Sequence, residues 1–299
     1  MSRFFSALLY YGVLIPISWL PFPVMYMFSD FFFFMLYRVF PYRKKLVMEN
    51  LRRSFPDKSE EELKRICEIF YRHFCDVVFE TLKVFTAPVN EISDRIEVVN
   101  SELLKEYYRQ GKSVIAVTGH YANWEWPAIT FSKHSDHHAS GIYKKLSNAF
   151  FDEKLRSTRA RFGTELMSTR DVADFFQQHT NDLYTYGFIN DQSPSNPAKG
   201  HWMKFLNQDT CMLLGAETYA VKYNMPVVYG KITKLRRGYY RIEYVNVCTS
   251  PATAPKFFVT EECSRINESL IRQAPEYWLW THRRWKHSKL NSEFRIQYS

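Results

Sequence analysis

The sequence predicts an α/β fold, in which a layered, mostly parallel central sheet is flanked by helices and preceded by an N-terminal membrane-anchoring helical segment. Three observations lead to this prediction. Short β-rich runs alternate with helical stretches after Pro88, which is typical of a parallel sheet. A long apolar stretch precedes them at the N-terminus. The 299 residues, 46% of them apolar, suffice to bury one large core.

The N-terminal stretch has no charged residue from Phe4 to Ser29, and an apolar run follows Asp30 and continues up to Arg38. About 20 apolar residues span the hydrocarbon core of a bilayer. Prolines interrupt the stretch at positions 16, 21 and 23. Because proline breaks or kinks a helix, we expect a kinked span or a two-helix membrane-inserted hairpin instead of one straight helix.

Positive charge is concentrated behind this stretch. Only Arg3 precedes it, whereas six basic residues follow: Arg38, Arg43, Lys44, Lys45, Arg52 and Arg53. This bias predicts that residues 1–42 form the anchor and that residues 43–299 form a domain on the cytoplasmic side. A cleaved signal peptide is the alternative, but no small-x-small cleavage site ends the apolar run. Five cysteines without a CxxC pair fit a reducing compartment and suggest neither a disulfide framework nor a zinc site.

A long amphipathic helix is predicted behind the anchor, because Ser59 and Glu62 form a capping box and apolar residues then recur at helical spacing. Glu80 in this helix is interpreted as solvated or capping. The β-rich runs cover residues 95–99, 113–118, 141–144, 183–189, 226–233 and 239–247. The helical candidates cover residues 123–132, 148–162, 171–179, 210–223 and 261–272.

One histidine occupies a position where this fold places functional groups. The strand that ends near Thr118 runs into Gly119-His120, and Asn123 is a good N-cap for the next helix. Glu125 in the first helical turn could then hold one imidazole nitrogen and leave the other free as a base that deprotonates an alcohol. The exposed N–H groups of the helix start could stabilise an oxyanion or a phosphate.

The spacing alone is weak evidence, because this composition produces roughly one histidine–acid pair five positions apart by chance, and a locally satisfied structural histidine is the simpler interpretation. The surrounding residues are more specific. The segment from Gly119 to Glu125 resembles the Gly-His-x-x-Asn-Trp-Glu block of the late acyltransferases of lipid A biosynthesis, the lauroyl/myristoyl transferase family. Three further blocks follow in the family's order: residues 159–163 resemble its Arg-x-Arg segment, 190–192 its Asp-Gln/His segment and 275–286 its C-terminal signature.

The resemblance implies a glycerolphosphate-acyltransferase-like fold of the lysophospholipid acyltransferase superfamily. It implies transfer of a fatty acyl group from acyl-acyl carrier protein to a hydroxyl of a lipid A precursor, at the cytoplasmic face of the inner membrane and in contact with membrane lipids. Neither a metal nor another cofactor is expected, and nucleic acid is not expected as a partner. The implied catalytic residues are His120 as the base and Glu125 as its orienting group. The implied substrate-binding residues are Asn123, Arg159, Arg161, Asp191 and Gln192.

Arginine suits bidentate binding of phosphate, although a structural ion pair between Arg159 and Asp191 is an equal alternative. The chain departs from the family pattern after Asp191, where residues 193–200 replace a glycine-rich stretch, and this leaves the acceptor open. The basic stretch 281–289 either contacts lipid headgroups or an acidic carrier, or forms a solvated face. Tryptophans 278, 280 and 285 either anchor at the membrane interface or belong to the core.

Several alternatives remain. A glycerophospholipid acyltransferase shares the His-x4-acid motif but carries Asp as the acid and a later Pro-Glu-Gly block, so Glu125 and residues 190–192 argue against it. An amino-acid-containing or glycosylated lipid acceptor stays open. From another class, the net charge of +9 suits a non-catalytic basic protein that binds a membrane surface or nucleic acid. An enzyme requires His120 in a cleft, with an apolar channel beside it and Arg159 or Arg161 on its polar side.

Overall fold

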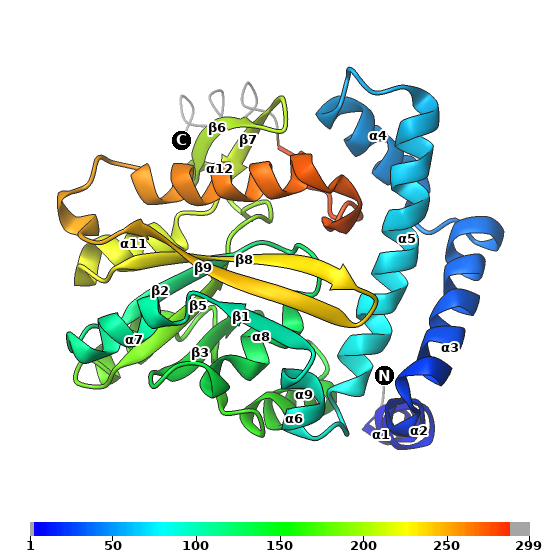
Figure 1. Ribbon diagram of the computed structural model, residues 1–299, viewed down its shortest axis with the longest axis horizontal. Helices are drawn as coiled ribbons and strands as arrows, with labels where there is room; N and C mark the ends of the chain where they lie inside the picture. The colour runs from blue at the N-terminus through cyan, green and yellow to red at the C-terminus, as the bar shows by residue number, and fades with distance from the viewer. Residues whose placement is uncertain (1–2, 288–299) are drawn as a thin grey trace.

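A seven-stranded sheet forms the centre of the computed structural model, which describes residues 3–287 (Figure 1). Its strand order is β1-β9-β8-β2-β5-β3-β4. All pairs are parallel except β8 with β9, so five strands share one direction and β9 and β1 run the other way. The strands are β1 (Ile96–Val99), β2 (Val114–Thr118), β3 (His138–Tyr143), β4 (Thr164–Ser168), β5 (Tyr184–Ile189), β8 (Val227–Arg236) and β9 (Tyr239–Cys248). The predicted α/β class with a mostly parallel sheet is confirmed.

Helices cover both faces of the sheet. Helices α11 and α12 lie on one face, and α6, α8 and α9 lie on the other side (Figure 1). The short strands β6 (His201–Phe205) and β7 (Gln208–Met212) pair as a separate antiparallel hairpin. The helices are α6 (Val89–Ser93), α7 (Glu102–Arg109), α8 (Glu125–Thr130), α9 (Ala149–Ala160), α10 (Val172–Gln178), α11 (Gly215–Tyr223) and α12 (Phe258–Gln273). Single 3₁₀ turns cover Phe131–Lys133, Pro197–Lys199, Pro251–Thr253 and Pro275–Tyr277.

Most predicted elements are present, but the helix predicted over residues 210–223 is wrong in its first part. Residues Gln208–Met212 are strand β7, and the helix begins only at Gly215. The physical reason is a tertiary contact, because Thr210 and its neighbours pair with β6 across the turn at Leu206 and Asn207, both of which have positive φ. Strand β4 and helix α7 were also not predicted.

The N-terminal segment folds as two helical stretches separated by Leu20 and Pro21. The first consists of α1 (Arg3–Leu9), a π-helical turn (Tyr10–Leu14) and α2 (Ile15–Trp19); the second consists of α3 (Phe22–Phe34) and a second π-helical turn, η2 (Met35–Val39). Phe22–Val39 is long and apolar enough, by length and composition, to cross a membrane. The break at Pro21 agrees with the expected interruption by proline.

Helix α3 packs along α5 (Glu60–Lys83), the long amphipathic helix (Figure 1). The predicted capping box is present, since Ser59 and Glu62 exchange side-chain-to-backbone hydrogen bonds. Phe22, Met25 and Phe33 of α3 are buried. Helix α4 (Lys44–Ser54), which was not predicted, connects the two. The N-terminal segment is therefore part of the packed structure on one side and exposes its other side.

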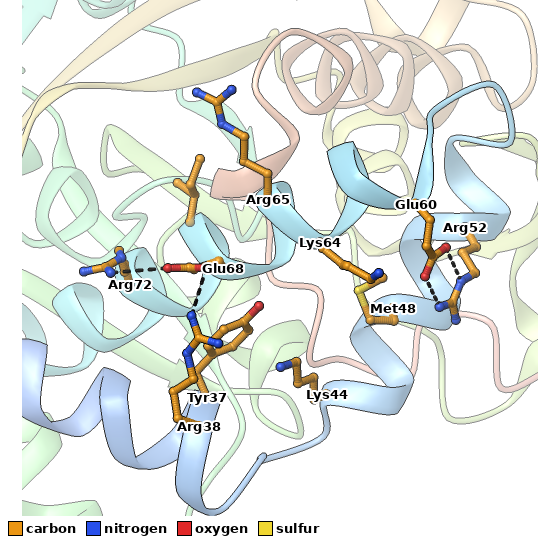
Figure 2. Close-up of a pocket in the computed structure, with 11 residues that line it drawn as sticks. Tyr37, Arg38, Lys44, Met48, Arg52, Glu60, Lys64, Arg65, Glu68 and Arg72 are labelled. Atoms are coloured by element: carbon orange, nitrogen blue, oxygen red, sulfur yellow. Dashed lines mark hydrogen bonds and ion pairs between the residues drawn. The ribbon is translucent and has the colours of Figure 1, made fainter.

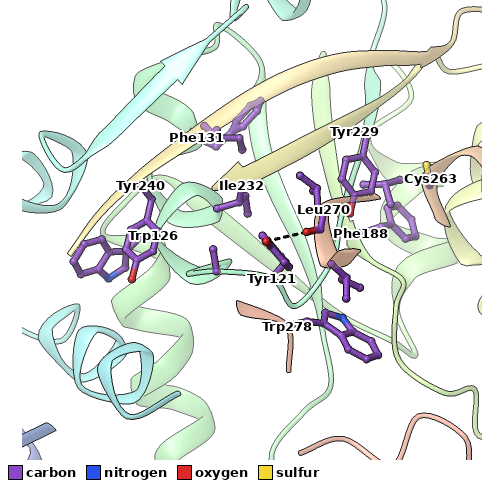
Figure 3. Packing of buried hydrophobic residues seen from close by; sticks show 14 of the residues in the cluster. Tyr121, Trp126, Phe131, Phe188, Tyr229, Ile232, Tyr240, Cys263, Leu270 and Trp278 are labelled. Carbon is purple, nitrogen blue, oxygen red and sulfur yellow. Dashed lines mark hydrogen bonds between the residues drawn. The ribbon is translucent and has the colours of Figure 1, made fainter. Parts of the chain in front are cut away.

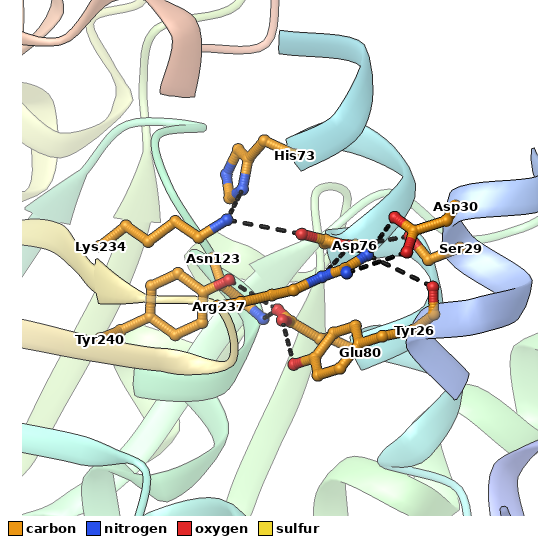
Figure 4. A network of polar contacts seen from close by, with 10 residues as sticks. All are labelled: Tyr26, Ser29, Asp30, His73, Asp76, Glu80, Asn123, Lys234, Arg237 and Tyr240. Carbon is orange, nitrogen blue, oxygen red and sulfur yellow. Dashed lines mark hydrogen bonds and ion pairs between the residues drawn. The ribbon is translucent and has the colours of Figure 1, made fainter. Parts of the chain in front are cut away.

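A network of buried polar groups joins α3, α5 and the β8–β9 hairpin (Figure 4). The interpretation of Glu80 as solvated is wrong, because this residue is fully buried. Its carboxyl group accepts hydrogen bonds from Tyr26 (2.8 Å), Asn123 (2.7 Å) and Tyr240 (2.7 Å). Burial raises the pKa of Glu80. Sequence periodicity could not reveal this, since the hairpin that covers Glu80 lies far away in the sequence.

Aromatic side chains form much of the core on both faces of the sheet, next to α8 and next to α12 (Figure 3). Tyr121 donates a hydrogen bond to the carbonyl oxygen of Leu270 at 3.1 Å. Trp278 and Trp280 are only 3% and 0% exposed, so the core interpretation of these two tryptophans is correct and the interfacial one is wrong. Both indole N–H groups find acceptors within the protein, as buried tryptophan requires.

Candidate active site

His120 lies directly behind β2 with both ring nitrogens engaged. Its Nδ1 is 2.6 Å from Oδ1 of Asp191, and its Nε2 is 3.0 Å from the side-chain nitrogen of Gln192. Its backbone N–H also donates to Oδ2 of Asp191 at 2.7 Å. With Asp191 accepting from Nδ1, the imidazole carries its proton there and presents an unprotonated Nε2.

The sheet register explains why His120 and Asp191 meet. Strands β2 and β5 are parallel neighbours, with Thr118 opposite Ile189. Each functional residue follows its strand end by two positions, so both side chains emerge at the same place on the carboxyl edge of the sheet. The expected His120–Glu125 contact is replaced by this one. The sequence contains the signal, an acid just after a second strand, but not the information that the two strands are adjacent.

Glu125 pairs instead with Arg159 from the last turn of α9, at 2.5 Å. Both side chains are partly exposed, by 22% and 16%, and both line the same cavity as His120. The partner of Arg159 is therefore Glu125, and the ion pair considered between Arg159 and Asp191 is not the one formed. Arg161 donates to the carbonyl oxygen of Val84 at 2.5 Å and does not line this cavity.

Asn123 holds the start of α8. It is fully buried, its amide nitrogen donates to Glu80, and its oxygen accepts from the backbone N–H groups of Glu125 and Trp126, both at 3.1 Å. These two N–H groups are thus satisfied within the protein, which differs from the expectation that they would face an oxyanion or a phosphate. All side-chain hydrogen bonds of Asn123 described here are structural, and they fix the position from which Glu125 points into the cavity.

Asp191 is buried and strongly stabilised as a carboxylate. Burial alone would raise its pKa, but attraction to the imidazolium form of His120 and hydrogen bonds from His120 and Trp278 lower the pKa of Asp191 to about 2. An ionised partner at Nδ1 keeps the imidazole in one tautomer and stabilises the imidazolium form. The pair can therefore accept a proton at Nε2.

A cavity of about 660 Å³ opens beside this pair, between the sheet and α8. Its lining is mostly apolar, with His120, Glu125, Arg159 and Gln192 among its polar groups. Small residues on adjacent strands create the space, because Ala116 of β2 is opposite Gly187 of β5, and Gly187 is opposite Gly141 of β3. The cavity has the size and character of a site for a small molecule with a long apolar part.

The C-terminal basic stretch is only partly a surface. Arg284 is 3% exposed and donates to the carbonyl oxygen of Cys211 at 2.9 Å, and burial lowers its pKa to about 10. Burial likewise lowers the pKa of His282 to about 4. Arg283 and Lys286 are exposed, and residues 288 and 289 lie outside the described part of the chain. The solvated-face interpretation therefore fails for Arg284.

An α/β sheet whose carboxyl edge carries a histidine–carboxylate pair next to a mostly apolar cavity is typical of an enzyme. The position of His120 in the cavity does not favour the non-catalytic alternative. Comparison with known proteins gives the family. Residues 1–287 match the model of the bacterial lipid A biosynthesis acyltransferases. The chain belongs to this family and is an acyltransferase of lipid A biosynthesis.

A curated relative matches this chain over almost the full length of both proteins. The lipid A biosynthesis lauroyltransferase of Escherichia coli (strain K12) is 22% identical over 298 residues, which cover 95% of this chain and 92% of the relative. The resemblance on which the sequence analysis relied is thereby confirmed. The matched range includes the N-terminal segment and the whole sheet.

Proposed function

We propose that the protein transfers a fatty acyl group from an acyl-acyl carrier protein to a hydroxyl of a lipid A precursor, with His120 as the general base. The observation that carries this proposal is the His120–Asp191 pair at the mouth of the apolar cavity. A fatty chain in the cavity would bring its thioester to the polar end, where His120, Gln192 and the Glu125–Arg159 pair lie.

In the proposed reaction, Nε2 of His120 removes the proton of the acceptor hydroxyl. The oxygen attacks the thioester carbonyl carbon, the carbon–sulfur bond breaks, and the departing thiolate receives the proton from the imidazolium. Atoms and charges balance without a covalent enzyme intermediate. Asp191 replaces Glu125 as the group that orients His120. The amide of Gln192, which occupies Nε2, has to give way to the hydroxyl.

We assign Glu125 and Arg159 to substrate binding and charge stabilisation. The ion pair is accessible from the cavity, so the guanidinium can reach a phosphate of the acceptor or the developing oxyanion while the carboxylate holds it in place. Gln192 lines the same end of the cavity. Asn123 contributes through the helix start that it caps, and the contacts of Arg161 give it no direct part.

We further propose that residues 1–42 attach the protein to the cytoplasmic face of the inner membrane. Support comes from the apolar helix Phe22–Val39 and from the aromatic side chains that it exposes, among them Phe31 (59% exposed) and Phe34 (53%). The role of the family in lipid A biosynthesis is consistent with a lipid acceptor at a membrane.

The direct test is acyl transfer by the purified full-length protein in neutral detergent. Lauroyl-acyl carrier protein is incubated with a lipid A precursor that carries a free acyl-chain hydroxyl, and mass spectrometry records the acceptor. We expect a gain of one acyl group with the native protein and not with His120→Ala. Parallel reactions contain a lysoglycerophospholipid or a glycosylated, amino-acid-containing lipid. Acylation of one of these and not of the lipid A precursor would contradict the proposed acceptor.

A further inference from the structure

A second large cavity, of about 700 Å³, lies away from the active site between η2, α4 and the first half of α5 (Figure 2). None of its lining residues lines the active-site cavity. Six cationic and two anionic side chains surround it: Arg38, Lys44, Arg52, Lys64, Arg65, Arg72, Glu60 and Glu68. The groove therefore has an excess of four positive charges.

The two carboxylates are already paired. Glu60 binds Arg52, and Glu68 lies 3.3 Å from Arg72 and 3.6 Å from Arg38. Lys44 and Lys64 take part in none of these ion pairs, nor in any other within residues 3–287. Figure 2 shows Lys64 pointing from α5 toward Met48 on α4, and Lys44 pointing toward the Tyr37 ring, 3.6 Å from its centroid. Arg65, the third cation of the groove without an ion pair among the described residues, points away from α4 in Figure 2. The two unpaired ammonium groups that face the space between the helices favour an anion there.

The position of the groove indicates the source of that anion. It begins at Arg38, in the helical turn that directly continues α3. The last exposed aromatic residue of α3, Phe34, lies four residues earlier. At 1.5 Å per residue the two are about 6 Å apart along the helix, which matches the roughly 5 to 7 Å thickness of one headgroup layer. If the exposed face of α3 lies in the hydrocarbon region, the groove opens at the level of the lipid phosphates.

We propose that this groove binds the phosphate of an anionic membrane lipid, with Lys44 and Lys64 as its principal ligands. The site is separate from the acceptor site and fixes how the protein sits on the bilayer. This inference rests on the membrane attachment proposed above but not on the chemistry of acyl transfer.

The test measures lipid binding by the full-length protein in neutral detergent, with phosphatidylglycerol, phosphatidylcholine and inorganic phosphate as probes. We expect phosphatidylglycerol to bind more tightly than the other two. The double variant Lys44→Gln/Lys64→Gln should weaken this binding about thirtyfold. Each lysine near an anionic lipid increases the affinity about fivefold, and the two effects multiply. The matched control is Lys222→Gln/Lys256→Gln, two exposed lysines that also lie beside aromatic rings.

The control should change phosphatidylglycerol binding less than twofold, and both double variants should retain the melting temperature of the native protein. Equal binding of the two phospholipids, an equal effect of both double variants, or phosphate binding as tight as that of phosphatidylglycerol would overturn the proposal. So would a groove variant that keeps its lipid binding but raises KM for the acyl carrier protein, because that result identifies an acidic protein as the partner. Turnover of a detergent-dispersed acceptor by the groove variant distinguishes failure of this site from failure of the proposed reaction.

Discussion

At the scale of single residues, the environment decides what each ionisable group can do. His120 and His282 are both near Asp191, yet only His120 forms hydrogen bonds with it and opens onto the cavity. Asp191 accepts two hydrogen bonds at Oδ2, from the His120 backbone and from the Trp278 indole, and a third at Oδ1 from the imidazole. The two donors at Oδ2 fix the orientation of the carboxyl group.

This geometry predicts a strong effect of Asp191→Asn. The two donors at Oδ2 require an oxygen, so the new amide nitrogen would face Nδ1 of His120 and force the proton onto Nε2. The base would then be in the wrong tautomer, and we expect kcat to fall by about 10² to 10⁴ with a folded protein. His120→Ala should lose ~10² or more. Steady-state kinetics and circular dichroism measure both effects.

Glu125→Gln is the informative comparison, because glutamine can still accept a hydrogen bond from Arg159. We expect its loss of kcat to be smaller than that of Asp191→Asn. A larger loss for Glu125→Gln would return the orienting role to Glu125, the role that the sequence suggested for it.

His282 predicts a dependence of stability on pH. Its folded-state pKa of about 4 lies below the ordinary value of 6.5, so the unfolded chain binds more protons between these pH values. Stability should therefore fall as the pH drops from 6.5 to 4. The buried His73, whose pKa is also lowered, acts in the same direction. Melting temperatures of native protein and His282→Gln should differ in slope over this range, with a shallower decline for the variant. Parallel slopes would contradict the assignment.

At the scale of secondary-structure elements, two contacts shape the site. Helix α5 supplies Glu80, which links α3 and the β8–β9 hairpin to Asn123 at the start of α8. Strands β2, β5 and β3 supply the small residues that leave room for the cavity. In both cases the residues that meet lie far apart in the sequence.

Replacing Glu80 by alanine should strongly destabilise the protein. The change removes the acceptor of the buried Asn123 and Tyr240 and of the partly buried Tyr26, and each unsatisfied buried group costs about 1 to 3 kcal/mol. Glu80→Gln should be mild, because its oxygen can accept from Asn123 and Tyr240 while its amide donates to the Tyr26 hydroxyl oxygen. Thermal melting in detergent distinguishes the two variants. An equally large loss for glutamine would show that the ionised carboxylate is required.

Gly141 tests whether the cavity holds the acyl chain. A Cβ atom there meets only Leu166, at an ordinary 3.7 Å, and Gly141 lines the cavity, so we expect a larger side chain at this position to occupy cavity space. Gly141→Leu should therefore shift the preferred donor to shorter chains, by about fourfold in kcat/KM for each methylene excluded, since a buried CH₂ contributes ~0.8 kcal/mol. Donors of ten to sixteen carbons provide the measurement. A uniform loss across all lengths would place the chain elsewhere.

At the scale of the whole molecule, the N-terminal segment, which we propose contacts the membrane, is also a part of the core. Met25 is fully buried, Ser29 donates to Asp76 at 2.8 Å, and Tyr26 binds Glu80. Arg237 of the β8–β9 turn reaches Asp30 of α3 at 2.7 Å. The exposed aromatic side chains lie on the remaining surface of the same helix.

Deletion of residues 1–39 should therefore aggregate the protein instead of releasing a soluble enzyme. The deletion uncovers the apolar face of α5 and leaves the Glu80 and Asp76 network open to water. Size-exclusion chromatography and circular dichroism of the truncated chain provide the measurement. A monodisperse, folded fragment would show that residues 40–299 fold independently of the N-terminal segment.

The sequence by itself determined the α/β class, an apolar N-terminal segment interrupted by proline, the long helix behind Ser59 and the position of His120 after a strand. These features depend on local periodicity, capping and proline chemistry, which neighbouring residues encode. Only the tertiary structure decided that Asp191 holds His120, that Glu125 pairs with Arg159 and that Glu80 is buried. Each of these depends on which strands are adjacent and which helix covers them, and such long-range pairing leaves no periodic signal in a single sequence.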